Sequence, residues 1–210
     1  MIRVLIADDH AIVREGLKQI LAETPDMVVT GEASDGAEAL KKVRENEYDV
    51  VVLDITMPGR SGLDVLKDLK AQRPELPVIV LSVHPENQYA VRVLRAGAAG
   101  YLTKLRAPEE LVTAIREASA GKTYITPLVG EELVQELVRD RGELLHERLS
   151  DREFELMLMI ASGKAIKEIA HELSLSPKTV STYHSRLLGK MAMRSDAELT
   201  RYVIENGLLD

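Results

Sequence analysis

Residues 50–54 read VVVLD, and residues 55–66 continue ITMPGRSGLDVL. A continuous run of β-branched apolar residues is typical of a strand that is buried on both faces, as in a parallel sheet. The run ends in the carboxylate of Asp54, and the Pro58-Gly59 pair that follows indicates a loop. This stretch therefore predicts an inner strand of an α/β sheet, with Asp54 at its carboxyl end.

Four further apolar runs lie within residues 1–121, and segments with helical spacing of apolar residues separate all five. One such segment carries Val13, Leu17 and Ile20, and Asp35 with Glu38 is typical of a helix start. The alternation predicts a doubly wound five-stranded parallel sheet over residues 1–121. The four runs are Val4–Ala7, Met27–Ala33, Pro77–Ser82 and Ala99–Thr103.

The rest of the chain has a different pattern. Residues 122–148 hold a short polar segment, a proline that can open a helix, and a charged helix-prone stretch around Leu133–Leu145, which together predict a partly helical linker. Residues 149–210 show no strand-like alternation and predict a small all-α domain. Its helix-start signatures are Ser150 with Glu153, Ser176-Pro177, and Ser195 with Glu198.

Composition excludes several classes of protein. The 210 residues include no cysteine, so a disulfide scaffold, a thiolate zinc site and a catalytic thiol are ruled out. No apolar run approaches the ~18 residues of a membrane span, and we expect a soluble cytoplasmic protein with no membrane partner. The net charge of −7 argues against a chain that coats nucleic acid along its whole length. Within Leu173–Ser195, however, four basic residues stand without an acidic one.

Charged and polar residues follow the predicted strands where each strand ends. Asp8-Asp9 follows the first, Asp54 ends the third, Ser82 ends the fourth and Lys104 follows the fifth. In a doubly wound sheet these ends form one edge, where ligands bind. Three carboxylates placed together repel one another, and a hard cation such as Mg²⁺ relieves the repulsion. The pattern predicts a magnesium site beside Asp54, which could then attack phosphorus as a nucleophile, while Lys104 offsets phosphoryl charge.

The strings LIADDH (5–10), VVVLDITMPGRSGLDVL (50–66), VIVLSVH (78–84) and AGAAGYLTK (96–104) resemble the receiver domain of response regulators, which has a CheY-like (flavodoxin-like) fold. The resemblance implies that Asp54 is the phosphoacceptor. It also implies a Mg²⁺ site formed by Asp8, Asp9, Asp54 and the backbone carbonyl of Thr56, switch residues Ser82 and Tyr101, and Lys104 as the phosphate-contacting lysine.

A three-residue turn, Ser174–Ser176, separates two predicted helices in the C-terminal part, as in a helix-turn-helix. The second of these helices has an apolar stripe that should face the core, made up of Val180, His184, Leu187 and Met191. Its opposite face and its end carry residues that can contact DNA, namely Lys178, Ser181, Thr182, Ser185, Lys190 and Arg194. From the residues alone, a helical dimerisation bundle with a solvated basic face is the alternative.

The string LSDREFELMLMIASGKAIKEIAHELSLSPKTVSTYHSRLLGKM (149–191) resembles a LuxR-type helix-turn-helix domain. The resemblance implies that Thr179 contacts a phosphate, and that Ser181, Thr182 and Ser185 lie where bases are met. Tyr183 stands where this family often has His, and His184 stands where an apolar residue or Arg is common.

Together the two halves resemble a NarL/FixJ-type response regulator. This implies a transcription factor whose partners are a sensor histidine kinase, double-stranded DNA and RNA polymerase, and which acts as a homodimer. It would not be an enzyme, beyond promoting phosphoryl transfer to and from its own Asp54.

Three other readings remain open. An aspartyl-phosphate phosphatase would need a second carboxylate just after the nucleophile, where this chain has Ile55, Thr56 and Met57. A flavin-binding module would need a phosphate-cradling loop after the first strand, where Asp8-Asp9 would repel phosphate. A regulator of the same architecture could also act without phosphorylation, although the complete acidic set disfavours this.

Overall fold

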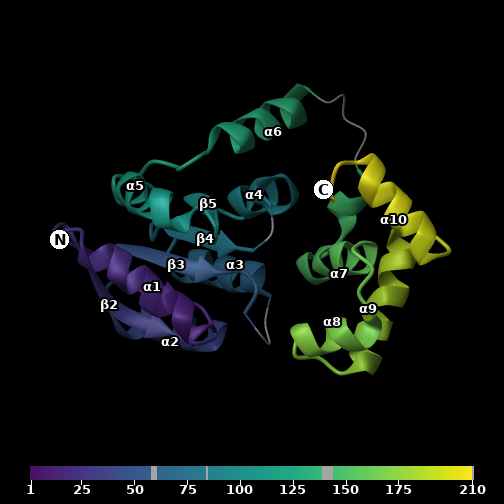
Figure 1. The fold of residues 1–210 in the computed structure, drawn as a ribbon, viewed down its shortest axis with the longest axis horizontal. Coiled ribbons are helices and arrows are strands. Elements are labelled where there is room, and N and C mark those ends of the chain that lie inside the picture. Colours follow the sequence, from purple (N-terminus) through teal and green to yellow (C-terminus); the bar gives the residue numbers. More distant parts are fainter. Residues whose placement is uncertain (58–60, 84, 139–143, 210) are drawn as a thin grey trace. The chain divides into compact units, whose positions relative to one another are not determined.

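The computed structural model describes residues 1–57, 61–83, 85–138 and 144–209, and it divides into two compact units, Met1–Val134 and Gln135–Asp210 (Figure 1). The predicted Pro58-Gly59 loop and part of the predicted linker (139–143) lie outside the described residues. Among the described helices, none is long and apolar enough to cross a membrane.

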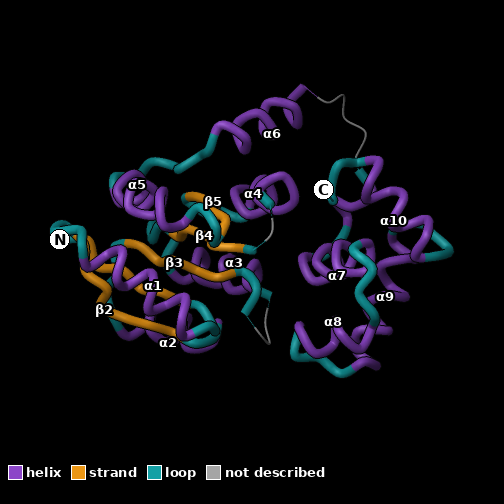
Figure 2. Tube along the Cα trace, in the orientation of Figure 1, coloured by secondary structure: helices purple, strands orange, loops and turns teal. Residues whose placement is uncertain are grey.

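The first unit is built on a parallel sheet of five strands in the order β2-β1-β3-β4-β5, which confirms the predicted fold (Figure 2). The order reverses direction at β1, so the carboxyl ends of β1 and β3 lie side by side where such folds bind ligands. The strands are β1 (Ile2–Ala7), β2 (Met27–Ala33), β3 (Val50–Asp54), β4 (Val78–Ser82) and β5 (Gly100–Thr103).

Helices cover both faces of this sheet. On one face, alternate residues of the strands, such as Ile6 and Val52, pack with Leu17 and Leu111 from α1 and α5 in a single buried cluster. On the other face α2 and α3 lie next to each other, and Asp35 starts α2 by accepting a hydrogen bond from the Glu38 N–H. The helices are α1 (Ala11–Ala22), α2 (Gly36–Glu45), α3 (Gly62–Gln72), α4 (Glu86–Arg95) and α5 (Ala107–Ser119).

The segment after α5 runs along the outer edge of β5. Tyr124 forms an isolated parallel bridge with Gly100, and its N–H donates to the Ala99 carbonyl at 2.7 Å. Helix α6 (Pro127–Val138) begins three residues later, at the proline expected to open a helix. The start of the predicted linker is therefore attached to the strand that carries Tyr101.

The second unit is helical, with α7 packed against both α9 and α10 (Figure 1). Ser150, Ser176 and Ser195 each cap the following helix by accepting a backbone N–H bond, as their sequence signatures predicted. Helix α7 ends before Gly163, whose φ of +86° favours glycine. The helices are η1 (Leu145–Arg148), α7 (Asp151–Ala161), α8 (Ile166–Glu172), α9 (Pro177–Lys190) and α10 (Asp196–Glu205).

Candidate phosphoacceptor site and DNA-binding helix

The structure brings Asp8, Asp54 and Lys104 together at the carboxyl edge of the sheet. The Asp54 side chain is fully buried and that of Asp8 is 1% exposed. Lys104 Nζ lies 2.7 Å from Asp54 Oδ2 and 2.7 Å from Asp8 Oδ2, so one ammonium group pairs with both carboxylates. The Lys104 N–H donates to the Ser82 carbonyl at 2.7 Å, which holds the lysine beside the end of β4.

The second oxygen of Asp54 is held by Thr56. Asp54 Oδ1 accepts hydrogen bonds from the Thr56 N–H at 2.9 Å and from Thr56 Oγ1 at 2.7 Å. These bonds fix the side-chain rotation, so each oxygen has a defined environment. They also place Thr56 directly beside the predicted metal site.

Asp8, Asp9, Asp54 and His10 each offer one ligand atom, and these four atoms lie within 4.8 Å of one another. Asp8 Oδ2 and Asp9 Oδ1 are buried, and apart from the ion-pair contacts with Lys104 and His10 neither oxygen has a hydrogen-bond partner among the described residues. Buried carboxylate oxygens with an incomplete shell, gathered in this way, fit a hard divalent cation that takes oxygen ligands. The predicted acidic pocket is therefore formed, and its donor set suits Mg²⁺.

His10 is a site residue that the sequence reasoning passed over. Its N–H donates to Asp8 Oδ1 at 2.8 Å, and its Nδ1 lies 2.9 Å from Asp9 Oδ1. Its position directly after Asp8-Asp9 was the available signal, because an imidazole two residues from a turn carboxylate can reach it.

Two opposing effects act on Lys104. Burial by itself lowers the pKa of the ammonium group, but the charges and hydrogen bonds of Asp54 and Asp8 outweigh it, so the pKa of Lys104 is raised. The lysine therefore carries its charge throughout the neutral range. A fixed cation beside Asp54 is what a transferring phosphoryl group needs.

Ser82 and Tyr101 form the next layer of the site. Ser82 is fully buried, Tyr101 is 1% exposed, and the two side chains are hydrogen bonded. Burial raises the pKa of Tyr101, with the nearby charges of Glu86 and Asp54 adding to the effect, so its hydroxyl keeps its proton. The ring is thus turned inward in this structure, next to the hydroxyl predicted to contact the phosphoryl group.

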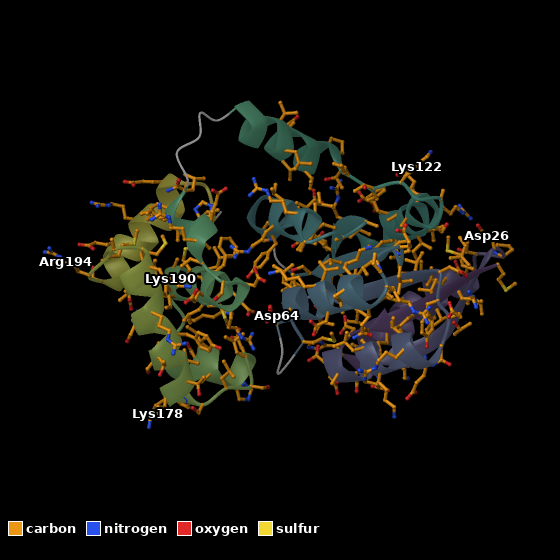
Figure 3. All side chains as sticks on the ribbon, turned by 180° about the vertical axis from the view of Figure 1, so that it is seen from behind. Asp26, Asp64, Lys122, Lys178, Lys190 and Arg194 are labelled. Carbon is orange, nitrogen blue, oxygen red and sulfur yellow. The ribbon has the colours of Figure 1, made fainter. Side chains whose placement is uncertain are left out.

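The predicted DNA-contacting residues lie on α9. Lys178, Ser181, Thr182 and Ser185 are exposed on one side, and Figure 3 shows Lys178 and Arg194 projecting away from the helical unit. The hydroxyls of Ser181, Thr182 and Ser185 donate to carbonyls four residues earlier, at 2.9 to 3.0 Å. Thr179 Oγ1 lies 2.8 Å from the capping Ser176 Oγ, at the first turn.

One residue of α9 differs from its expected environment, and a second forms an ion pair that the sequence did not predict. Val180, Leu187 and Met191 are buried as predicted, but His184 is partly exposed, and its Nε2 lies 2.6 Å from Asp196 Oδ1 on α10. His184 departs from the apolar stripe because an imidazole retains more favourable interactions beside a carboxylate than in a core. Lys190, predicted to contact DNA, places its Nζ 2.6 Å from the buried Glu153 carboxylate.

The comparisons with known proteins agree with both halves of this structure. Residues 4–116 match the response regulator receiver domain, and residues 147–203 match the bacterial regulatory proteins of the luxR family. A receiver domain implies a histidine kinase partner, and a LuxR-type helix-turn-helix implies DNA binding. Together they define a response regulator transcription factor.

The relatives extend over nearly the whole chain. Response regulator UvrY of Escherichia coli K12 is 41% identical over 209 residues, 99% of this chain and 96% of the relative. Response regulator GacA of Pseudomonas protegens is 40% identical over 210 residues, 100% of this chain and 99% of the relative. The chain belongs to the NarL/FixJ family of two-component response regulators.

A solved structure of a response regulator also matches nearly the whole chain. RcsB of Salmonella enterica serovar Typhimurium, bound to the rprA promoter in the presence of the phosphomimetic BeF₃⁻, is 28% identical with a TM-score of 0.63. The match covers 97% of this chain and 99% of RcsB.

Proposed function

We propose that Asp54 is phosphorylated by a histidine kinase with the help of Mg²⁺, and that the phosphorylated form binds DNA as a homodimer. The observation that carries the proposal is the position of Lys104, whose ammonium group pairs with Asp54 and Asp8 at 2.7 Å in a buried pocket. Asp8, Asp9, Asp54 and the Thr56 carbonyl would hold the metal ion. Bound there, Mg²⁺ would offset negative charge on the phosphoryl oxygens.

The transfer step follows from these contacts. An Asp54 oxygen forms a bond to phosphorus, and the bond between phosphorus and the donor imidazole nitrogen breaks, with its electron pair going to that nitrogen. Thr56 holds Asp54 in one rotamer during the attack, and Lys104 stabilises the charge on the equatorial oxygens. Hydrolysis by water would later reverse the modification, and the chain would need no other substrate.

The signal would arise because an acyl phosphate changes what Lys104 and Ser82 contact. A dianionic group replaces the Asp54 carboxylate, Lys104 turns to it, and the Ser82 hydroxyl donates to a phosphoryl oxygen while Tyr101 stays inward. Moving a two-state equilibrium from 1:99 to 99:1 takes about 5.5 kcal/mol of differential stabilisation. These new contacts supply part of that amount.

On the DNA side, we propose that Lys178 and Thr179 contact phosphates, and that Ser181, Thr182 and Ser185 meet base edges. The exposure of α9 on this side supports the assignment. A dimer would present two such helices to two half-sites, and RNA polymerase would be the partner on promoters. We place this activity in the cytoplasm because its DNA target is the chromosome.

The first test selects genomic DNA fragments with the purified full chain and Mg²⁺, with and without beryllofluoride. We expect paired, two-fold-related half-sites to be enriched only with beryllofluoride, and Asp54→Asn to abolish this dependence. Equal enrichment in both arms would contradict control by Asp54 and favour a regulator that works without phosphorylation. Absence of enrichment in both arms would contradict DNA binding by residues 149–210.

A further inference from the structure

A buried carboxylate that takes no part in phosphoryl transfer lies beside the switch residues. Glu86, the first residue of α4, is 3% exposed. Its Oε1 accepts from Arg106 at 3.2 Å, and its Oε2 accepts from the Thr126 hydroxyl, which is also buried. We call Glu86, Arg106 and Thr126 the carboxylate latch.

The latch joins three parts of the receiver unit that are far apart in the chain. Glu86 starts α4, Arg106 caps α5, and Thr126 immediately precedes α6. The Thr126 hydroxyl oxygen also accepts the Val129 N–H at 3.4 Å, so the group that bonds Glu86 is the one that satisfies the first turn of α6. Any displacement of Glu86 therefore acts directly on the start of this helix.

The latch also lies next to the proposed switch. Glu86 follows Ser82 by four residues, and its charge contributes to the raised pKa of Tyr101. Tyr101 is on β5, and the neighbouring Gly100 is bridged to Tyr124, two residues before Thr126. Tyr124 is fixed in turn by its hydroxyl, which donates to Glu110 at 3.1 Å. A continuous set of contacts thus runs from Ser82 through Tyr101 to α6.

Stability alone gives little reason to bury an ionic group here. The Glu86 carboxylate is buried but the Arg106 side chain is 45% exposed, so their attraction is screened by solvent while the carboxylate still loses its hydration, and such pairs are weak contributors to folding. They are better suited to holding one arrangement among alternatives, because a displaced partner leaves an uncompensated charge.

We propose that Glu86 and Thr126 are positioning residues that couple the state of Asp54 to the start of α6. The inference rests on the proposed function, since it assumes that Asp54 is phosphorylated. When the phosphoryl group draws Ser82 toward it, Glu86 moves with the start of α4, the bond to Thr126 weakens, and the first turn of α6 loosens. The order of the first turn of α6 then depends on whether Asp54 is phosphorylated.

The test is hydrogen exchange of the full chain with Mg²⁺, with and without beryllofluoride. In the wild type we expect beryllofluoride to protect the Thr56 amide and to speed exchange of amides 128–134 by about 2- to 10-fold, the range for loss of one hydrogen bond. In Glu86→Gln and Thr126→Val, these α6 amides should exchange fast even without beryllofluoride, and adding beryllofluoride should not change their exchange rate. Thr126→Ser keeps the hydroxyl and should behave as wild type.

The matched control is Glu109→Gln, which removes an equal charge from an exposed position in the first turn of α5. It should keep the wild-type response. Coupling is reciprocal, so Glu86→Gln and Thr126→Val should also bind beryllofluoride more tightly by the same factor, measured by calorimetric titration. A purely structural role would leave that affinity unchanged.

The outcomes separate the two proposals. Protection of Thr56 without any change in α6 of the wild type would overturn the latch and leave the phosphoacceptor assignment intact. A wild-type response that persists in both latch variants would overturn it as well. Failure of beryllofluoride to protect Thr56 in the wild type would overturn the proposed function, and the coupling with it.

Discussion

In the phosphoacceptor pocket, Asp54 is buried and bonded to Lys104, fifty residues away, whereas the hydroxyls on the exposed side of α9 bond to carbonyls of their own helix. Under the proposed function, the pocket is preorganised because its groups must be in place before the phosphoryl donor arrives. The side of α9 has its hydroxyls satisfied locally, and under the proposed function they would exchange these bonds for contacts with DNA. The contacts of the pocket are thus made by the fold itself, whereas those proposed for the side of α9 would be made with DNA.

Substituting Asp54 should have the largest effect, because it removes the oxygen proposed to form the bond to phosphorus. Asp54→Asn should abolish phosphoryl uptake from a small-molecule donor such as acetyl phosphate, measured by mass spectrometry of the intact chain. Thr182→Ala, on the exposed side of α9, is the control and should be phosphorylated normally. If Asp54→Asn still takes up a phosphoryl group, the buried carboxylate of Asp54 is not the acceptor, and the contrast between the pocket and α9 no longer holds.

Lys104→Ala should have the next largest effect. It removes the cation that pairs with Asp54 and Asp8, so phosphorylation should persist at a lower rate, while the gain in DNA affinity on adding beryllofluoride falls at least about tenfold, or ~1.4 kcal/mol. The control is Lys122→Ala, an exposed lysine after α5 that Figure 3 shows at the surface of the receiver unit. An unchanged gain in Lys104→Ala would contradict a role for Lys104 in the response.

Thr182→Ala tests whether the exposed side of α9 contacts bases, and Lys178→Ala tests whether it contacts phosphates. If Thr182 meets a base edge, its loss should cost ~1–3 kcal/mol at particular base pairs and leave other sequences unaffected. Lys178→Ala should weaken binding to all sequences alike and reduce the slope of affinity against salt by about one. The measurement is affinity for a panel of single-base variants at two salt concentrations, and a uniform loss for Thr182→Ala would reassign it to phosphate.

The pocket could be predicted more fully than the side of α9, for a physical reason. Strand ends of a doubly wound sheet meet at one edge, so Asp8, Asp54, Ser82 and Lys104 could be grouped from their places in the chain alone. The ion pair of Lys190 with Glu153 could not, because it depends on how α9 crosses the start of α7. Side chains that bridge separate elements need the packing to be known.

Lys190 combines features of both kinds of site, because it is on α9 and also forms an ion pair with a buried carboxylate. Its substitution should have the smallest effect of those considered. Glu153 accepts bonds from Ser150 and from Lys190, and these outweigh burial, so the pKa of Glu153 is lowered in the folded chain. A carboxyl group with a lowered pKa stabilises the fold above its unfolded pKa of about 4.3, and that contribution is lost as the pH falls through the folded value.

Lys190→Ala should therefore lower the free energy of unfolding of the helical domain by about 1 kcal/mol at pH 7, and by less as the pH falls below about 4. The measurement is urea unfolding of the full chain at several pH values, with the exposed Arg201→Ala as the control. If Lys190 acts mainly on Glu153, Lys190→Ala leaves the salt dependence of DNA binding unchanged. If instead the slope of DNA affinity against salt falls by about one, with no change in stability, Lys190 contacts a DNA phosphate, as proposed for Lys178.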